Sequence, residues 1–399
     1  MNIAVIGGGA SGLFAAIAAK NDSTEVVIYE KEKRLGRKIL ATGNGRCNMT
    51  NINASLKDYH SRDVNFMQGA LKRFWVDDTL SMFEEMGILW KEEEKGKVYP
   101  YSDTASSVLD VLRMRVDMLG IKTECEFAVV SVRKHGDGFI IENGTGEKRK
   151  CDRVIIATGG KAGASLGSDG SGYKLLQGFG HKITPLMPSL VQIKTDTEFV
   201  RKLKGVKVMA KVTIGGRDET GELLFTDYGI SGPPVFSLSS YLSSNKTVDI
   251  DIMPEYTYDD VYEMICMRCA YLCDFALEDF FVGMLNKRVG QAILKEAGIS
   301  PLSRKAATLS DNEMHSITKL IKHLTLNIKG TASWNSAQVT KGGADVSQFD
   351  KNTMQSRLVE GLYACGEILD IDGDCGGYNL QWAWSSGYLA GKAASNNIR

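Results

Sequence analysis

The stretch NIAVIGGGASG at residues 2–12 joins a short β-branched, apolar run to a turn of closely spaced glycines. A helix-forming segment follows at 13–20, and a second apolar run at 26–29 ends in Glu30. This order of strand, glycine turn, helix, strand and acid is typical of a Rossmann βαβ unit that binds a dinucleotide. A buried βαβ unit without a ligand would explain the glycines, but it would not explain the acid.

The three glycines of the G-x-G-x-x-G pattern have separate predicted roles. Gly7 permits the tight turn, Gly9 lets the backbone approach a pyrophosphate, and Gly12 lets the helix pack closely on the strand. The helix N-terminus presents free amides and the positive end of its dipole to the phosphates. Glu30 lies 18 residues after Gly12, where it can accept hydrogen bonds from the ribose of an adenosine.

The composition is that of an ordinary globular protein. The 399 residues are 43% hydrophobic and 24% charged, which suggests two or three domains with a large core. Lys+Arg and Asp+Glu both number 48, so the net charge is zero and no general attraction to nucleic acid or anionic membranes is expected. A zero net charge does not exclude a local basic patch. We expect no membrane span and no signal peptide. The eight scattered cysteines suggest reduced thiols in a cytoplasmic protein.

Three further glycine-rich segments accompany the first. They are GRKILATGNGRCN at 36–48, ATGG at 157–160 after a continuous apolar strand, and CGEILDIDGDCGGYNLQ at 365–381. These are more phosphate- and ring-binding loops than one nicotinamide site needs, which favours FAD. No second strand followed by G-x-G-x-x-G is present, so NAD(P)H would bind only transiently, or a protein partner would deliver the electrons.

The character of the chain changes at Pro185 and Pro188. Alternating β segments follow to about residue 253, and the chain is then mostly helical to about residue 325. We predict an α/β fold with three parts: a discontinuous nucleotide-binding domain (1–188 and 338–399), an inserted β domain (189–255 and 325–337) and a helical subdomain (256–324).

Several motifs extend over nearly the whole chain in a fixed order: GGGASG, EK…LGRK, GNGRCNMTN, ATGG, TDYGISGP and CGEILDIDGDCGGYNLQWA. Together they resemble the HI0933-like flavoproteins, also called BaiN-like or aminoacetone-oxidase-like FAD enzymes. The GRCN and GGYNLQ segments are far more specific than the glycine turn, whereas the loop at 161–170 departs from many members. The resemblance implies FAD in a glutathione-reductase-like, two-dinucleotide Rossmann domain that is interrupted by a β-barrel and a helical subdomain.

The resemblance also implies roles for individual residues. Arg37 and Lys38 would lie near the phosphates or the ribityl chain, and the backbone of Val129 would contact the adenine. The residues near the isoalloxazine would be Gly377, Asn379, Leu380 and Gln381. The predicted cofactor-binding set is Gly7, Gly9, Ala10, Ser11, Gly12, Glu30, Lys31, Arg37, Lys38, Gly45, Asn48, Val129, Thr158, Gly159, Gly366, Glu367, Asp370, Gly376, Gly377, Asn379, Leu380 and Gln381.

No catalytic residue stands out. Cys47 and Cys375 lie in predicted flavin loops, with a structural role as the alternative, and Asp227 and Tyr228 lie in a turn motif, TDYGISGPP at 226–234. We predict no metal site. Three cysteines at helical spacing lack a nearby histidine as fourth ligand, so we expect core packing from Cys266, Cys269 and Cys273.

We expect a FAD-dependent oxidoreductase of the EC 1.3 class that delivers a hydride to a conjugated C=C bond of a steroid-enone-like or uracil-like small molecule, with NAD(P)H as transient reductant. Two alternatives stay open. One is an amine oxidase that uses oxygen. The other is an RNA-associated flavoprotein, which would use a cluster of basic residues at Lys202, Lys204, Lys207 and Lys211. The alternative for that cluster is a solvated sheet edge.

Overall fold

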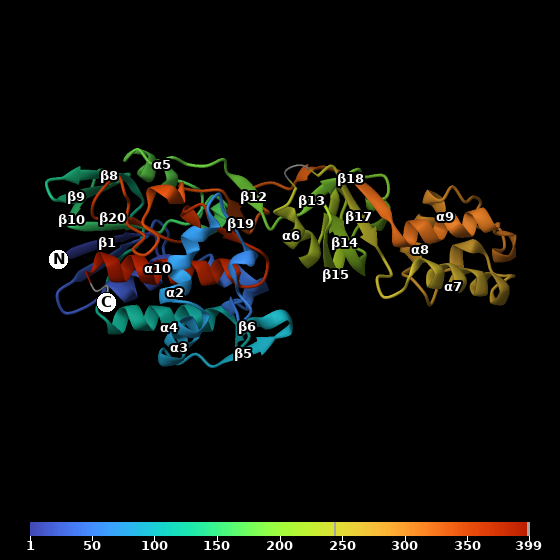
Figure 1. The fold of residues 1–399 in the computed structure, drawn as a ribbon, viewed down its shortest axis with the longest axis horizontal. Coiled ribbons are helices and arrows are strands. Elements are labelled where there is room, and N and C mark those ends of the chain that lie inside the picture. The colour runs from blue at the N-terminus through green and yellow to red at the C-terminus, as the bar shows by residue number, and fades with distance from the viewer. Residues whose placement is uncertain (243–244, 397–399) are drawn as a thin grey trace. The chain divides into compact units, whose positions relative to one another are not determined.

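The computed structural model describes residues 1–242 and 245–396, which form two compact units (Figure 1). Unit 1 comprises Met1–Pro188 and Trp334–Arg399, and unit 2 comprises Ser189–Ser333. Each unit has its own buried hydrophobic core. The α/β class is as predicted, and the finer division of the insertion into a β part and a helical part stays a prediction.

The centre of unit 1 is a parallel sheet in the order β20-β11-β1-β2-β7. Most of its strands are short apolar runs with buried side chains, which is typical of a parallel sheet covered on both faces. The strands are β1 (Asn2–Ile6), β2 (Glu25–Tyr29), β7 (Lys122–Glu124), β11 (Arg153–Ile156) and β20 (Leu362–Ala364). Because β20 pairs with β11, the C-terminal part of the chain completes the sheet that the N-terminus begins.

Two helices of unit 1 pack closely because small residues face each other. They are α1 (Ala10–Ala19), which connects β1 to β2, and α10 (Tyr378–Ala394). A Cβ atom added at Gly387 would lie 2.4 Å from the carbonyl oxygen of Ser11, and one at Gly391 would lie 2.2 Å from that of Ala15. Side chains at these two positions would therefore push α10 away from α1.

Smaller sheets surround this centre. They pair β8 (Val129–His135) with β9 (Gly138–Asn143) and β10 (Lys148–Cys151), β3 (Thr50–Asn51) with β6 (Lys97–Pro100) and β5 (Trp90–Glu93), β4 (Tyr59–His60) with β21 (Asp372–Gly373), and β12 (Met187–Ser189) with β19 (Val339–Lys341). The remaining α-helices described in this unit are α2 (Gln68–Arg73), α3 (Val76–Glu85), α4 (Ala105–Met118) and α5 (Gly172–Gln177).

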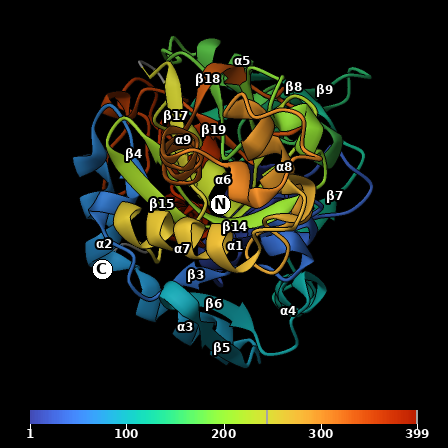
Figure 2. The ribbon, with the colours of Figure 1, turned by 90° about the vertical axis from the view of Figure 1, so that its right-hand side faces the viewer.

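Unit 2 contains the inserted barrel that the family resemblance implies. Its strands close in the order β13-β16-β15-β14-β17-β18, and helices share the hydrophobic core of the barrel (Figure 2). The strands are β13 (Ile193–Thr195), β14 (Lys207–Ile214), β15 (Arg217–Phe225), β16 (Gly229–Ser231), β17 (Thr247–Asp251) and β18 (Leu324–Thr331). The helices are α6 (Pro233–Ser239), α7 (Tyr258–Tyr271), α8 (Lys287–Glu296) and α9 (Asp311–Lys322).

The segment 226–234 corrects a prediction in part. Asp227 and Tyr228 do lie in a tight turn, in which the amide of Thr226 donates to the carbonyl oxygen of Gly229 at 2.9 Å, but strand and helix follow it. Gly229 begins the barrel strand β16, and a Cβ there would lie 2.1 Å from the carbonyl oxygen of Ile193. Pro233 then occupies the first turn of α6, where a missing amide hydrogen costs nothing. The glycine and the prolines therefore serve close strand pairing and helix initiation.

Among the helices of residues 1–242 and 245–396, none combines the length and the apolar character that a membrane crossing requires.

Candidate functional site

The turn after β1 contains two kinds of glycine: Gly7 and Gly12 pack against neighbouring backbone, and Gly9 faces open space. A Cβ at Gly7, where φ is 104°, would lie 2.5 Å from the carbonyl oxygen of Ala157, and one at Gly12 would lie 1.9 Å from that of Gly7. A Cβ at Gly9 would meet nothing within 4 Å. Gly7 and Gly12 are therefore required by the fold, whereas Gly9 leaves room in front of the helix.

The N-terminus of α1 borders this open space. Its N-cap is Gly9, which gives no side-chain cap, and the first turn carries no acid. The first amides of a helix have no intrahelical acceptor, so those of Ala10 and Ser11 are donors for an anion.

The C-terminal segment lies directly against this first turn. A Cβ at Gly366, where φ is 78°, would lie 2.4 Å from Ser11 Oγ, and Ser11 Oγ donates to the carbonyl oxygen of Cys365 at 3.4 Å. The amide of Gly366 donates to Ser386 Oγ at 2.9 Å. The structure thus brings Ser11 and Gly366 together although 355 positions separate them in the chain.

Glu30 is buried at the end of β2 and holds the glycine turn. Its Oε2 accepts from the amide of Gly8 at 2.7 Å, and its Oε1 accepts from the amide of Glu32 at 2.9 Å. Its carbonyl oxygen accepts from the amide of Phe127 at 2.9 Å, so the segment that leads to Val129 lies beside it. Each carboxylate oxygen keeps capacity for a further donor, and the predicted contacts of Glu30 and Val129 with an adenosine stay a prediction.

An ion pair joins three of the predicted cofactor loops. Lys38 Nζ lies 2.7 Å from Glu367 Oε2 and donates to the carbonyl oxygen of Ala162 at 2.9 Å. Glu367 Oε1 accepts from the amide of Thr340 at 2.8 Å, and Thr340 Oγ1 accepts from the amides of Lys161 and Ala162. The loop at 36–48, the turn after β11 and the C-terminal segment meet here, and Thr340 is a residue that the sequence did not single out.

Truncation of Glu367 tests this junction. We expect Glu367→Ala to destabilise unit 1 by about 2 kcal/mol, because Lys38 and the Thr340 amide lose a charged acceptor. All five tryptophans (residues 75, 90, 334, 382 and 384) lie in unit 1, so thermal unfolding followed by tryptophan fluorescence reports on this unit. Glu263→Ala, on the exposed side of α7 in unit 2, is the control. An unchanged midpoint for Glu367→Ala would mean that the junction carries no stability.

Two other predicted cations are paired with acids. Lys31 lies 2.7 Å from Asp169, and Arg37 pairs with Glu32 and donates to the carbonyl oxygen of Ser165 at 3.1 Å. These contacts fasten the loop at 161–170 to the loop at 31–38. The cations therefore have protein partners, and their predicted contact with FAD stays a prediction.

The N-terminus of α10 resembles that of α1. Gly377, where φ is 99°, is an N-cap without a side-chain cap, and a Cβ there would lie 2.4 Å from the carbonyl oxygen of Thr50 and 2.8 Å from Asn48 Oδ1. Gly376 precedes it with φ of 151°. Asn48 is 9% exposed, and its Oδ1 has no hydrogen-bond partner among the described residues. A buried acceptor without a donor therefore lies at a second uncapped helix N-terminus.

The turn after β11 contains a second such atom. Thr158 Oγ1 is buried without a partner among the described residues, and Gly159 adopts φ of 72° with its Cβ position 2.9 Å from Ser168 Oγ. Gly45 lies exposed at the end of the 36–48 loop with φ of 85°. Unsatisfied buried acceptors are costly, so Asn48 and Thr158 are places where a bound group would supply the missing donor.

The side chains of Gln381 and Asn379 form hydrogen bonds to other residues of the protein. Gln381 Oε1 accepts from Thr50 Oγ1 at 2.5 Å, and its Nε2 donates to Thr79 Oγ1 and Ser385 Oγ, both at 2.9 Å. Asn379 binds both the amide and the carbonyl oxygen of Gly373, at 2.8 and 2.7 Å. Both amides thereby position the start of α10, whereas Leu380 between them is half-buried.

Two buried acids follow the junction at Glu367. Asp370, which was predicted as a cofactor residue, and Asp372, which was not, are 5% and 1% exposed, and Oδ2 of each has no partner among the described residues. The sequence signal for Asp372 was the alternation of acids in DIDGD at 370–374. Alternation alone does not show which of the acids are buried.

The candidate catalytic side chains differ in their surroundings. Cys47 is fully buried, and burial raises the pKa of its thiol to about 12 against the opposing hydrogen bond with Thr42. Such a thiol stays protonated at neutral pH and is a poor nucleophile, so we give it no chemical role. Cys375 is half-buried. In unit 2, Asp227 lies 2.7 Å from Lys204, whose hydrogen bond lowers the pKa of the carboxyl, and Tyr228 is exposed.

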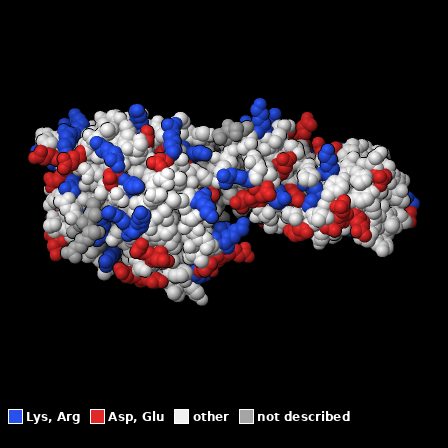
Figure 3. All heavy atoms as spheres, in the orientation of Figure 1, with Lys and Arg blue, Asp and Glu red and all other residues white. Residues whose placement is uncertain are grey.

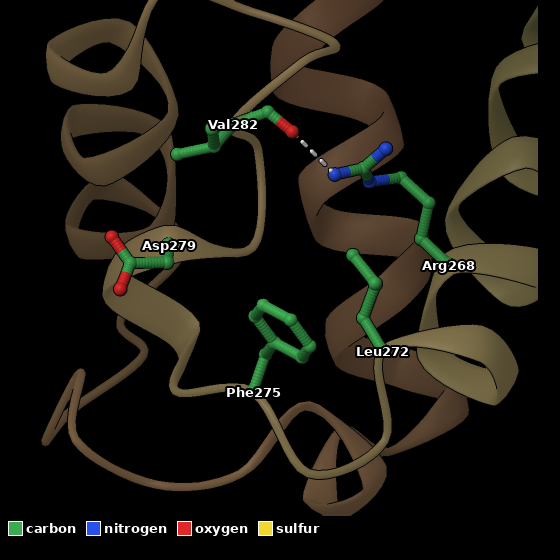
Figure 4. Close-up of a pocket in the computed structure, with 5 residues that line it drawn as sticks. All are labelled: Arg268, Leu272, Phe275, Asp279 and Val282. Atoms are coloured by element: carbon green, nitrogen blue, oxygen red, sulfur yellow. Dashed lines mark hydrogen bonds between the residues drawn. The ribbon is translucent and has the colours of Figure 1, made fainter.

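Unit 2 has a surface hollow of its own, lined by Arg268, Leu272, Phe275, Asp279 and Val282 (Figure 4). The guanidinium of Arg268 donates to the carbonyl oxygens of Phe280 and Val282, and Asp279 lies 2.6 Å from Lys287. Both charged groups already have partners, and the hollow offers no glycine loop. The group of loops in unit 1 is therefore the candidate site.

The Rossmann unit, the two uncapped helix N-termini and the unsatisfied acceptors define a FAD-binding oxidoreductase. The family model described as "HI0933-like protein Rossmann domain" matches residues 1–393. The chain belongs to this family, as its motifs indicated.

Relatives with assigned activities match over the full length. The chain is 39% identical to a 3-dehydro-bile acid delta(4,6)-reductase of Clostridium scindens, with 98% of each chain covered. It is 32% identical to a ribosomal RNA dihydrouridine synthase of Haemophilus influenzae, again over 98% of each, and to one of Escherichia coli, over 96% of this chain and 95% of that protein.

Proposed function

We propose that this protein is a FAD-dependent reductase that uses NAD(P)H to reduce a conjugated C=C bond in a steroid-like enone. The observation that carries the proposal is the full-length similarity, at 39% identity, to a reductase that acts on the Δ4,6 double bonds of a bile acid. FAD supplies the hydride chemistry when it is bound, and the protein supplies position, electrostatics and exclusion of water.

The residues present fit FAD. We propose that the amides of Gly9, Ala10 and Ser11 hold the pyrophosphate, because the N-terminus of α1 is uncapped and a Cβ at Gly9 would meet nothing within 4 Å. Glu30 and the backbone of Val129 would hold the adenosine end. At the other end, the amides at Gly376 and Gly377 and the unsatisfied Oδ1 of Asn48 would receive the polar edge of the flavin ring.

The RNA alternative rests on the two relatives that are named for ribosomal RNA. The predicted basic cluster does not support it, because each lysine has an acidic neighbour: the distances are 4.0 Å for Lys202–Glu296, 2.7 Å for Lys204–Asp227, 2.8 Å for Lys207–Glu222 and 3.9 Å for Lys211–Asp218. On the face drawn in Figure 3, basic and acidic side chains are intermixed over both units. A phosphate backbone favours unpaired cations, so the enone is the preferred substrate.

Anaerobic titration tests the proposal. The purified protein should carry bound FAD, bleach on addition of NADH or NADPH, and regain its colour when a 3-oxo-4-ene or 3-oxo-4,6-diene steroid is added. Reoxidation by oxygen with consumption of small amines would instead identify an amine oxidase. A salt-sensitive gel shift with ribosomal RNA fragments, together with inert enones, would favour the RNA alternative. A protein that takes up no FAD would refute the whole proposal.

A cytoplasmic location completes the proposal. It is supported by the eight cysteines, since none of them forms a disulfide in the described part of the chain and reduced thiols are usual in that compartment. An electron-donor protein in place of NAD(P)H would show itself in the same titration, because neither nicotinamide would then bleach the flavin.

A further inference from the structure

A buried carboxyl lies beside a histidine–carboxylate pair at the end of the candidate site. β21 pairs antiparallel with β4, which places Asp372 opposite His60. Asp372 is 1% exposed, whereas the side chains of His60 and Asp374 are 17% and 25% exposed and bond each other through His60 Nε2 and Asp374 Oδ1 at 2.7 Å. The partly exposed pair therefore lies next to the buried acid.

The position of Asp372 relative to the cofactor loops is fixed by hydrogen bonds. The next residue, Gly373, is held at its amide and its carbonyl oxygen by Asn379 of α10. Asp372 precedes Gly377, the N-cap of α10, by five residues. It therefore belongs to the segment to which the proposed function assigns the flavin ring.

The charges around Asp372 come from three elements. Burial raises the pKa of Asp372 to about 7, while His60 of β4 and Lys341 of β19 act to lower it and the neighbouring acids Asp370 and Asp374 act to raise it. A carboxyl with this pKa can both give up and regain a proton near neutral pH, which suits a general acid. Burial also raises the pKa of Asp370, while Thr184 and the backbone of Arg62 act to lower it.

We propose that Asp372 stores the proton that the reduction consumes, and that His60 and Asp374 return a proton to it from solvent. The inference rests on the proposed function. In each turnover NAD(P)H supplies a hydride with two electrons, which forms one new C–H bond, and a proton forms the second as the C=C π bond is lost. The O–H bond of Asp372 breaks to provide that proton and forms again from water through the pair.

The first test needs no turnover. Because the folded carboxyl binds its proton more tightly than the unfolded one, wild-type stability should fall as the pH rises from about 4 to the folded pKa of about 7. Asp372→Asn should lack this part of the pH dependence, so its tryptophan-monitored Tm should rise relative to wild type between pH 5 and pH 8. Asp370→Asn removes a like charge, so the pH at which half of this stability is lost should be lower than in wild type. Asp218→Asn, on the surface of unit 2, should change neither.

The second test is the pH profile of enone reduction. Wild-type kcat should fall as the pH rises through about 7, since the protonated carboxyl is the active form. Asp372→Asn should retain FAD but lose at least about tenfold in kcat and this pH dependence. His60→Gln should lower kcat and move the midpoint of the pH profile to higher pH, because His60 acts to lower the pKa of Asp372. If wild type reduces enones and Asp372→Asn keeps its kcat and pH profile, the proton-store role is wrong. If wild type reduces none, the proposed function fails, and the unfolding profiles still decide whether Asp372 binds the proton. If Asp372→Asn does not fold, the pH shift of the stability profile in Asp370→Asn decides whether Asp372 binds the proton.

Discussion

Gly12→Ala should lose its flavin and unfold at a much lower temperature than wild type, whereas Gly9→Ala should fold normally and lose only flavin affinity. A Cβ at Gly12 would lie 1.9 Å from the carbonyl oxygen of Gly7, so the backbone of the turn has to move, at a cost of about 3 kcal/mol. A Cβ at Gly9 meets nothing within 4 Å, and the residue has an ordinary φ of −83°. The methyl group would occupy only the space that we assign to the pyrophosphate.

Tryptophan-monitored unfolding and the flavin content of the purified protein distinguish the two effects. Gly144→Ala is the matched control, because a Cβ there would have only an ordinary contact at 3.9 Å with Val130. It should resemble wild type in both measurements. Full flavin occupancy in Gly9→Ala would show that the pyrophosphate does not approach this turn, and wild-type stability in Gly12→Ala would show that the turn is more yielding than its geometry indicates.

Gln381→Ala should destabilise unit 1 by about 4 kcal/mol, because it removes the shared partner of three buried hydroxyls and leaves a cavity. Thr50, Thr79, Gln381 and Ser385 are all 0% exposed, and the four side chains join β3, α3 and α10. Without the amide, the hydroxyls of Thr50 and Thr79 lose a partner that water cannot readily replace. The start of α10, where the flavin ring is proposed to bind, would then lose its support.

The measurements are again the tryptophan-monitored midpoint and the retained flavin. Gln177→Ala, an exposed glutamine at the end of α5, is the control and should change neither. If Gln381→Ala matched the control in stability but lost its flavin, the side chain would be a direct cofactor ligand and would not be the support of the start of α10.

Local patterns were sufficient to predict much of the fold. The apolar runs, the glycine spacing and Glu30 identified the βαβ unit, because strand, turn and helix propensities act over a few neighbouring residues. The change in pattern after Pro188 indicated an insertion with β and then helical character. The turn predicted at 226–234 covers only Thr226–Gly229. The prediction extended too far because glycine and proline also occur where strands approach closely and where helices begin.

The sequence could not rank residues of the same type. Gly9 and Gly12 are the same residue type, yet only Gly12 lies against the backbone of another residue. The lysines from 202 to 211 form a basic cluster in the sequence, and the structure places an acid beside each. Asp370, Asp372 and Asp374 alternate in one loop, but burial and the neighbouring His60 distinguish Asp372.

By itself, the sequence determined the Rossmann class, the family and the choice of FAD, because these depend on motifs in which the determining residues are close together. The tertiary structure decided which residues lie side by side: Lys38 with Glu367, Asn48 with Gly377, and His60 with Asp374 and Asp372. These partners lie more than 300 positions apart in the chain. Hydrogen bonding, burial and charge act through distance in space, so only the folded chain reveals which acceptors lack a donor and which acids are buried.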